Sequence, residues 1–259
     1  MLQIKPTEHF TGLTIQGDYN DFSELMDSIN RITTSVENVD SFYYGVSKKL
    51  LEIRHEIQCA NMYGKIVLKD NGMNDTLMSR HKINTPMENV YYSANVLFPE
   101  AIFVAASVPK MYGYAASSYE VKRKDSFLGF DLPPLPYVYY IRDKANLDVL
   151  CAGIWQALGK VIGNEELQML LKKVQQMEDN EYIHYATHYI DKCNIVLLET
   201  PVEKRKEKLK NIAKNIIEKS EDYKRTERYL EHWSKECGTS IYNLCDQSIG
   251  VPFPNEIDW

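Results

Sequence analysis

Hydrophobic and polar positions along the first half of the chain follow the periods of strands and amphipathic helices. Apolar and polar residues alternate over residues 12–16, which predicts a strand. Apolar residues over 22–32 then repeat on one helical face, with Asn20 or Asp21 as a suitable N-cap. A longer helix with a thicker apolar surface is predicted over residues 42–62.

Two further strands and a helix that starts with proline complete the predicted first half. Residues 65–69 match a strand that closes on the turn residues 70–72, D-N-G. Residues 89–97 are rich in side chains that fit a pleated surface. Pro99 suits the first turn of a helix, which Pro109 should kink or end. This order of elements predicts a small sheet covered by helices.

The second half shows mainly helical periodicity. Residues 146–162 and 164–177 predict two consecutive helices. The run T-P-V-E over 200–203 combines a capping box with proline at the first helical position. Another helical face follows Ser220 and ends at Gly238. The predicted fold class is therefore α+β, with the sheet in the N-terminal half and a mainly helical C-terminal half.

Composition changes between residues 117 and 136. The run D-L-P-P-L-P favours extended backbone, because proline fixes φ and restricts the residue before it. We therefore divide the chain into an α+β domain (1–116), a proline-containing connector (117–136) and a mainly helical domain (137–259). A ligand for a proline-binding domain is the alternative interpretation of the connector.

Charge and composition narrow the class of protein. Thirty Lys and Arg residues against thirty-six Asp and Glu give a net charge of -6, which disfavours wholesale attraction to nucleic acid or anionic lipid. No apolar stretch reaches the ~20 residues of a membrane span, and the first residues lack a secretory pattern. Five cysteines without a C-x-x-C pair suit free thiols. We expect a cytoplasmic protein without a membrane partner.

The stretch E-Y-I-H-Y-A-T-H-Y-I-D-K-C contains the clearest candidate for metal binding. On a helix, Glu181, His184, His188 and Asp191 would share one face, and such residues can bind zinc or a similar ion. The spacing matches neither H-E-x-x-H nor a repeated E-x-x-H unit, and the opposite arc is apolar. A stripe facing water or another subunit is the alternative. No cofactor is expected apart from a divalent metal here.

Other candidates lie on predicted helices. Arg54 could bind a carboxylate or phosphate and His55 could transfer a proton, although both also suit a helix surface. Residues 203–228 hold ten Lys and Arg against six Asp and Glu, so this basic face could contact nucleic acid or simply be solvated. Arg225 and His232 resemble the R-x(4-6)-H element of HEPN ribonucleases, in which Arg and His act on the RNA phosphodiester.

Three stretches resemble an uncharacterised bacterial family, a domain of unknown function. They are F-T-G-L-T-I-Q-G-D-Y-N-D-F (10–22), D-N-G-M (70–73) and N-V-Y-Y-S-A-N-V-L-F-P-E (89–100). The resemblance covers roughly residues 8–115. It implies a bacterial, cytosolic protein with an α+β amino-terminal domain, and it implies no activity or catalytic residue.

The sequence leads to two alternative functions. No phosphate-binding glycine loop, dinucleotide fingerprint, nucleophile elbow or paired C-x-x-C is present, which argues against several large enzyme classes. We predict a non-catalytic accessory subunit of a bacterial cytosolic assembly, such as a phage-defence system, which binds a protein partner or its own copies through tyrosine-rich surfaces. The alternative is a metal- or His-dependent hydrolase acting on RNA or a nucleotide.

Overall fold

The structure is a computed structural model that describes residues 2–34, 39, 41–119, 123–124, 131–132, 134–244 and 256–259. Its main sheet is antiparallel and has the strand order β1-β2-β4-β3. The strands are β1 (Gln3–Pro6), β2 (Gly12–Gly17), β3 (Lys65–Asp70) and β4 (Glu88–Leu97). The three predicted strands are confirmed to within one residue, whereas β1 escapes prediction because four residues are too few to show a period of two.

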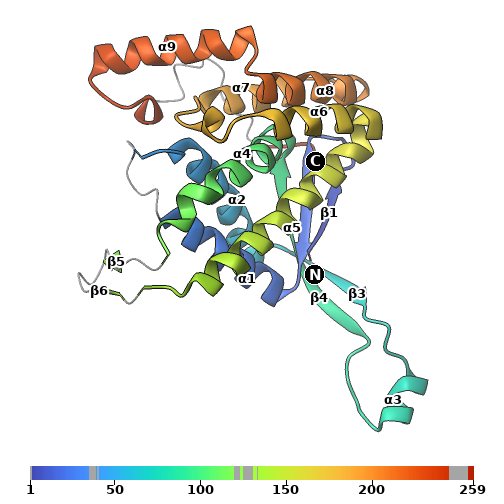
Figure 1. The fold of residues 1–259 in the computed structure, drawn as a ribbon. Helices are drawn as coiled ribbons and strands as arrows, with labels where there is room; N and C mark the ends of the chain where they lie inside the picture. The colour runs from blue at the N-terminus through green and yellow to red at the C-terminus, as the bar shows by residue number, and fades with distance from the viewer. Residues whose placement is uncertain are drawn as a thin grey trace.

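Helices cover one face of the sheet at its inner end (Figure 1). Leu13 lies opposite Val96 and Ile15 opposite Ala94 across the β2–β4 pair, and all four side chains are buried on this face. The covering helices include α1 (Tyr19–Thr33), α2 (Tyr44–Tyr63) and α4 (Phe98–Ala116). Their apolar faces and this face of the sheet form a common core, as the alternation predicts.

The predicted N-cap of α1 is wrong, and so is one of the two predicted effects of Pro109, the end of the helix. The N-cap of α1 is Asp18 rather than Asn20 or Asp21, and Asp18 accepts a hydrogen bond from the Asp21 backbone in a capping box. Helix α4 does not end at Pro109 but continues to its C-terminal residue Ala116. Pro109 itself is exposed.

The second half is mainly helical, as predicted, and a small two-stranded sheet lies within the predicted connector before it. The strands of that sheet are β5 (Arg123–Lys124) and β6 (Asp131–Leu132). The helical elements are α5 (Tyr137–Ile162), α6 (Asn164–Gln176), η2 (Asp179–Tyr182), α7 (His188–Leu198), α8 (Val202–Glu218), α9 (Glu221–Cys237) and η3 (Ile241–Asn243). The predicted capping box does not form, because the Thr200 hydroxyl donates to the Val196 carbonyl and Pro201 is the N-cap.

The two halves pack on one another along α5. This helix contacts α1, α4 and β1, and one hydrophobic core contains residues from both halves. The fully buried Asp143 on α5 accepts hydrogen bonds from Nε and Nη2 of Arg31 on α1, at 2.8 and 2.7 Å. Half of the predicted connector lies outside the described residues, and Pro136 is the N-cap of α5. Whether residues 1–116 or 137–259 fold alone stays a prediction.

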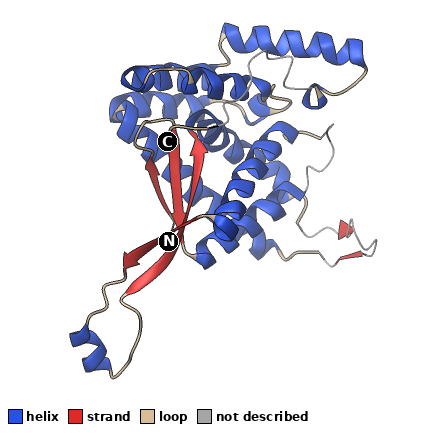
Figure 2. Ribbon diagram, turned by 180° about the vertical axis from the view of Figure 1, so that it is seen from behind, coloured by secondary structure: helices blue, strands red, loops and turns tan. Residues whose placement is uncertain are grey.

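An arm projects from the outer end of the sheet. It consists of β3, α3 (Asp75–His81) and the outer residues of β4, which together span residues 65–92 (Figures 1 and 2). Helix α3 begins with an Asn74 cap and buries none of its residues. The sequence therefore shows no apolar face that would predict this helix. Among the described residues, no helix is both long and apolar enough to cross a membrane.

Candidate functional site

The predicted helix over residues 181–193 does not form. The 3-10 helix η2 ends at Tyr182, His184 has a φ of +54°, and α7 begins only at His188. Tyr182 and Tyr185 are fully buried and pack on the Phe103 ring, with ring centroids at 5.8 and 4.7 Å. Burial of large aromatic side chains releases more free energy than one turn of helix, so this packing decides the backbone path.

The four predicted metal ligands therefore point to different partners. Glu181 pairs with Lys219 at 3.1 Å, and Asp191 pairs with Lys49 at 2.6 Å. His188 Nε2 lies 3.2 Å from the Leu244 carbonyl, and His184 packs edge-on against the Phe42 ring. The described part of the chain contains no group of three or more His, Cys, Asp or Glu side chains arranged to hold a metal ion.

Nine of the eighteen tyrosines are buried in the core rather than placed on a binding surface. Tyr182, Tyr185, Tyr189 and Tyr223 are among the largest fully buried side chains. Tyr185 and Tyr223 stack with centroids 4.4 Å apart, and Tyr189 meets Tyr223 edge-on. These four tyrosines are therefore structural and cannot contact a partner protein.

The basic face and the ribonuclease-like pair lie on α8 and α9. Arg225 and His232 are both exposed on α9, and neither lines a described cavity. Of the basic residues in 203–228, Arg205 is buried and donates to the Thr11 hydroxyl at 2.9 Å, and Lys210 pairs with Glu166 at 2.5 Å. Nucleic-acid binding by this face stays a prediction.

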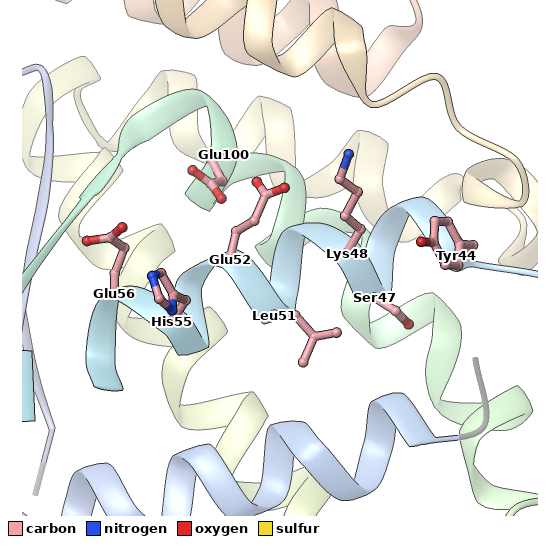
Figure 3. A pocket seen from close by; sticks show the side chains of 8 residues that line it. All are labelled: Tyr44, Ser47, Lys48, Leu51, Glu52, His55, Glu56 and Glu100. Carbon is pink, nitrogen blue, oxygen red and sulfur yellow. The ribbon is translucent and has the colours of Figure 1, made fainter. Parts of the chain in front are cut away.

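The first candidate cavity lies along α2 and contains His55. Its volume is about 510 Å³, and its lining residues on α2 recur at intervals of three or four, which places them on one helical face. His55, Glu52 and Glu56 come from α2, and Glu100 reaches in from the first turn of α4 (Figure 3). Arg54 does not line the cavity and donates instead to Gln58 at 3.0 Å.

A second cavity of about 250 Å³ shares three of these carboxyl residues, Glu52, Glu56 and Glu100. Its opposite side comes from α7 and from the described C-terminal residues. The remaining lining residues are Lys49, Asn95, Val96, Leu97, Asp191, Asn194, Ile257 and Trp259. The two cavities thus meet at a set of carboxyl groups around one lysine.

Lys49 is the centre of this charge cluster. It is 3% exposed, and its Nζ lies 2.6 Å from Glu52 Oε2 and 2.6 Å from Asp191 Oδ1. Burial, the largest single influence, lowers the pKa of Lys49, but the combined attraction of Glu100, Asp191 and Glu52 raises that pKa above its usual value. The lysine is therefore fully charged, and we call these four residues the Lys49 cluster.

Glu100 is the carboxyl group that Lys49 does not neutralise. Burial, and then the nearby Glu52 and Asp191, raise the pKa of Glu100 to about 8 against the opposing effect of Lys49. The Glu100 carboxyl also shares a hydrogen bond with Glu52, and the two groups point toward one another in Figure 3. At neutral pH the Glu100 carboxyl is therefore protonated and can donate a hydrogen bond or a proton.

The sequence pointed to two residues of this site, but as a candidate proton-transfer residue and a candidate metal ligand. It selected His55 and Asp191 but missed Lys49, Glu52 and Glu100. Two signals were present: Glu100 is the lone charged residue in the apolar run over 96–108, and Lys49 lies within the apolar face of its helix. A charged residue on a face that packs into the core requires a partner from another element.

The arm is a second candidate surface, and it is apolar where the Lys49 cluster is charged. Ile66 lies opposite Tyr92 and Leu68 opposite Val90, so these side chains share one face of the β3–β4 ladder. Ile66 is 58% exposed, Leu68 57% and Val90 44%. This face continues the one that the helices cover at the inner end of the sheet.

A family model for a domain of unknown function, DUF6904, matches residues 2–259. The chain belongs to the DUF6904 family. The match extends beyond the resemblance over residues 8–115 and includes the helical second half, so the sheet, the Lys49 cluster and the arm all lie within the DUF6904 region. Searches of curated proteins and of solved structures found no match to the chain.

Proposed function

We propose that this DUF6904 protein is a non-catalytic accessory subunit that binds a protein partner through the apolar face of the arm. The observation that carries this proposal is the row formed by Ile66, Leu68 and Val90, which are exposed on a hairpin that leaves the body of the molecule (Figure 1). Exposed apolar side chains that form a contiguous patch typically mark an interaction site.

The position of the row supports an interaction role over a stabilising one. At the inner end of the sheet, the same face packs against helices and stabilises the fold. On the arm, Leu68 and Val90 are exposed, and an isolated two-stranded hairpin gains little stability from such residues. A partner that covers this face would bury them and gain their hydrophobic free energy.

The edge of the sheet adds a second means of binding. Strand β3 is an edge strand in the order β1-β2-β4-β3, so one side of its backbone is not paired within the main sheet. Extended edges of this kind pair with strands from other chains. A partner could therefore combine backbone hydrogen bonds with apolar contacts, in a bacterial cytosolic assembly of the kind that the sequence led us to expect.

Site-specific photocrosslinking in the native cell tests this proposal. A photoreactive phenylalanine analogue replaces Leu68 on the arm, and in a matched protein it replaces Val149, which is 47% exposed on α5. We expect one discrete adduct from position 68 and none from position 149. The double substitution of Ile66→Thr and Leu68→Thr, placed beside a crosslinker at Val90, should abolish the adduct, because threonine keeps β-branching but lacks the apolar surface.

Two results would reject the proposal. One is the absence of any adduct from the arm positions, and the other is an identical adduct pattern from positions 68 and 149. Circular dichroism of the double variant ensures that a loss of crosslinking reflects the surface rather than unfolding.

A further inference from the structure

The smaller cavity contains more negative than positive charge. Four carboxyl residues line it, Glu52, Glu56, Glu100 and Asp191, against the single cation Lys49. Lys49 already forms close ion pairs with Glu52 and Asp191. The cavity holds about 250 Å³, far more than the ~30 Å³ share of one liquid water molecule, so it has room for a small organic molecule.

Asn194 provides an independent sign of a missing ligand. It is 3% exposed, it lines this cavity, and its Oδ1 atom has no hydrogen-bond partner among the described residues. Asn194 follows Asp191 by three residues on α7, so both side chains lie on the same side of that helix. A buried acceptor without a partner costs stability, and a ligand with an N–H group would satisfy it.

Apolar side chains form another wall of the cavity. Ile257 and Trp259 line it, and the Trp259 ring packs so closely on Gly12 that a Cβ atom there would lie 2.8 Å from the ring. The segment is held in place by Asp258, whose carbonyl accepts from the Thr11 hydroxyl at 2.5 Å and whose carboxylate lies 2.5 Å from the His9 ring. An indole ring attracts cations to its face and also covers hydrocarbon.

We propose that this cavity binds a small organic cation with N–H donors, a primary ammonium or a guanidinium on a short carbon chain. The cationic group donates hydrogen bonds to Asn194 Oδ1 and to the carboxylates of Asp191 and Glu100. The carbon chain lies against Ile257 and Trp259. Neither this binding nor its test depends on the arm.

Binding also changes the protonation of Glu100. The charged groups around it are Lys49, Glu52 and Glu56 on α2 and Asp191 on α7. In the absence of ligand, the excess of negative charge and burial keep this carboxyl protonated up to about pH 8. A bound cation takes the place of that proton. Cation binding therefore releases a proton at neutral pH and becomes tighter as pH rises toward 8.

Titration calorimetry with the full chain and agmatine tests the proposal. We expect saturable binding that strengthens between about pH 6.5 and pH 8, by at most tenfold per unit, with proton release visible as a dependence on the buffer's ionisation enthalpy. Tetramethonium, which has a quaternary trimethylammonium group at each end of a four-carbon chain, carries the same double charge as agmatine without N–H donors, and it should bind at least about tenfold more weakly than agmatine.

Three variants locate the site. Asn194→Leu should weaken agmatine binding by about 10-fold or more, since it removes the acceptor, yet leave the thermal midpoint unchanged or higher. Glu100→Gln should weaken binding and abolish the proton release. Glu165→Gln, on an exposed carboxylate of α6, is the matched control and should bind like the unsubstituted protein.

The proposal is overturned if agmatine does not bind at millimolar concentration, or if Asn194→Leu binds it as well as the unsubstituted protein does. It is also overturned if tetramethonium binds equally well, because charge alone would then explain the affinity. Saturable binding of Mg²⁺ that agmatine does not displace would assign the cavity to a metal ion instead.

Discussion

Charged residues usually lie in water and apolar residues in the core. The Lys49 cluster and the arm are opposite exceptions to this distribution. Around Lys49, a buried cation forms ion pairs with the partly exposed Glu52 and Asp191 where α2, α4 and α7 meet. On the arm, Ile66 and Leu68 lie in water although the same sheet face is buried at its inner end. Both arrangements cost folding free energy, and features retained against stability concentrate at functional sites.

The two regions differ in how they respond to a ligand. The Lys49 cluster lines a cavity of about 250 Å³, so a molecule that binds there must be small and must satisfy hydrogen bonds. The arm offers an open apolar face and an unpaired strand edge, which suit a macromolecule. Substitutions at matched positions can therefore separate the two.

The largest expected effect distinguishes the covered from the uncovered end of the sheet. Ile15→Ala removes a fully buried side chain and should lower the free energy of unfolding by about 2 to 5 kcal/mol. Ile66→Ala, at 58% exposure, should lower it by less than about 1 kcal/mol. Urea denaturation of both variants measures the difference, and equal losses would show that the arm is packed in solution.

The next effect concerns the central lysine. Lys49→Met leaves the carboxyl groups of the cluster without their cation and should cost about 2 to 3 kcal/mol, less than a fully enclosed pair because Glu52 remains partly solvated. The neighbouring Lys48→Met is the control and should change the free energy of unfolding by less than about 0.5 kcal/mol. If Lys49→Met left the free energy of unfolding unchanged, the ion pairs at Lys49 would contribute nothing to folding.

The third prediction is a pH dependence. The folded state raises the pKa of Glu100 to about 8 from an ordinary value of 4.5, so the folded protein binds more protons than the unfolded chain between these values. The contribution of Glu100 to stability is complete below pH 4.5 and is lost as pH rises toward 8. Its slope is at most about 1.4 kcal/mol per pH unit.

Glu100→Gln checks this assignment, because glutamine keeps the shape of the protonated carboxyl but cannot ionise. Unfolding free energies of both proteins are measured at intervals across this range. The difference between them should change in favour of the variant as pH rises. A difference that is independent of pH would show that Glu100 titrates normally.

The smallest expected effect is a gain in stability at Asn194, which lines the cavity beside the Lys49 cluster. Asn194→Leu removes the buried Oδ1 acceptor, which has no partner among the described residues, and should raise the free energy of unfolding by about 1 kcal/mol. The adjacent cavity can accept the extra volume of leucine. A loss of stability would mean that Asn194 is a structural residue rather than a ligand-binding one.

The sequence by itself determined the elements whose hydrophobic period is long and regular. The strands at residues 12–16, 65–69 and 89–97, the α+β class and the helical second half all follow from alternation and helical spacing. These patterns are local, because a residue's face within one element depends only on its neighbours in the chain. The same local reasoning also brought His55 and Asp191 to notice.

Only the tertiary structure decided where the elements break and which side chains meet. The stripe from Glu181 to Asp191 has helical spacing, but burial of Tyr182 and Tyr185 against Phe103 outweighs one helical turn and separates its members. Lys49 and Glu100 lie on different helices, so their shared site exists only after packing. Likewise, exposure of the arm depends on where the covering helices end, which no local period encodes.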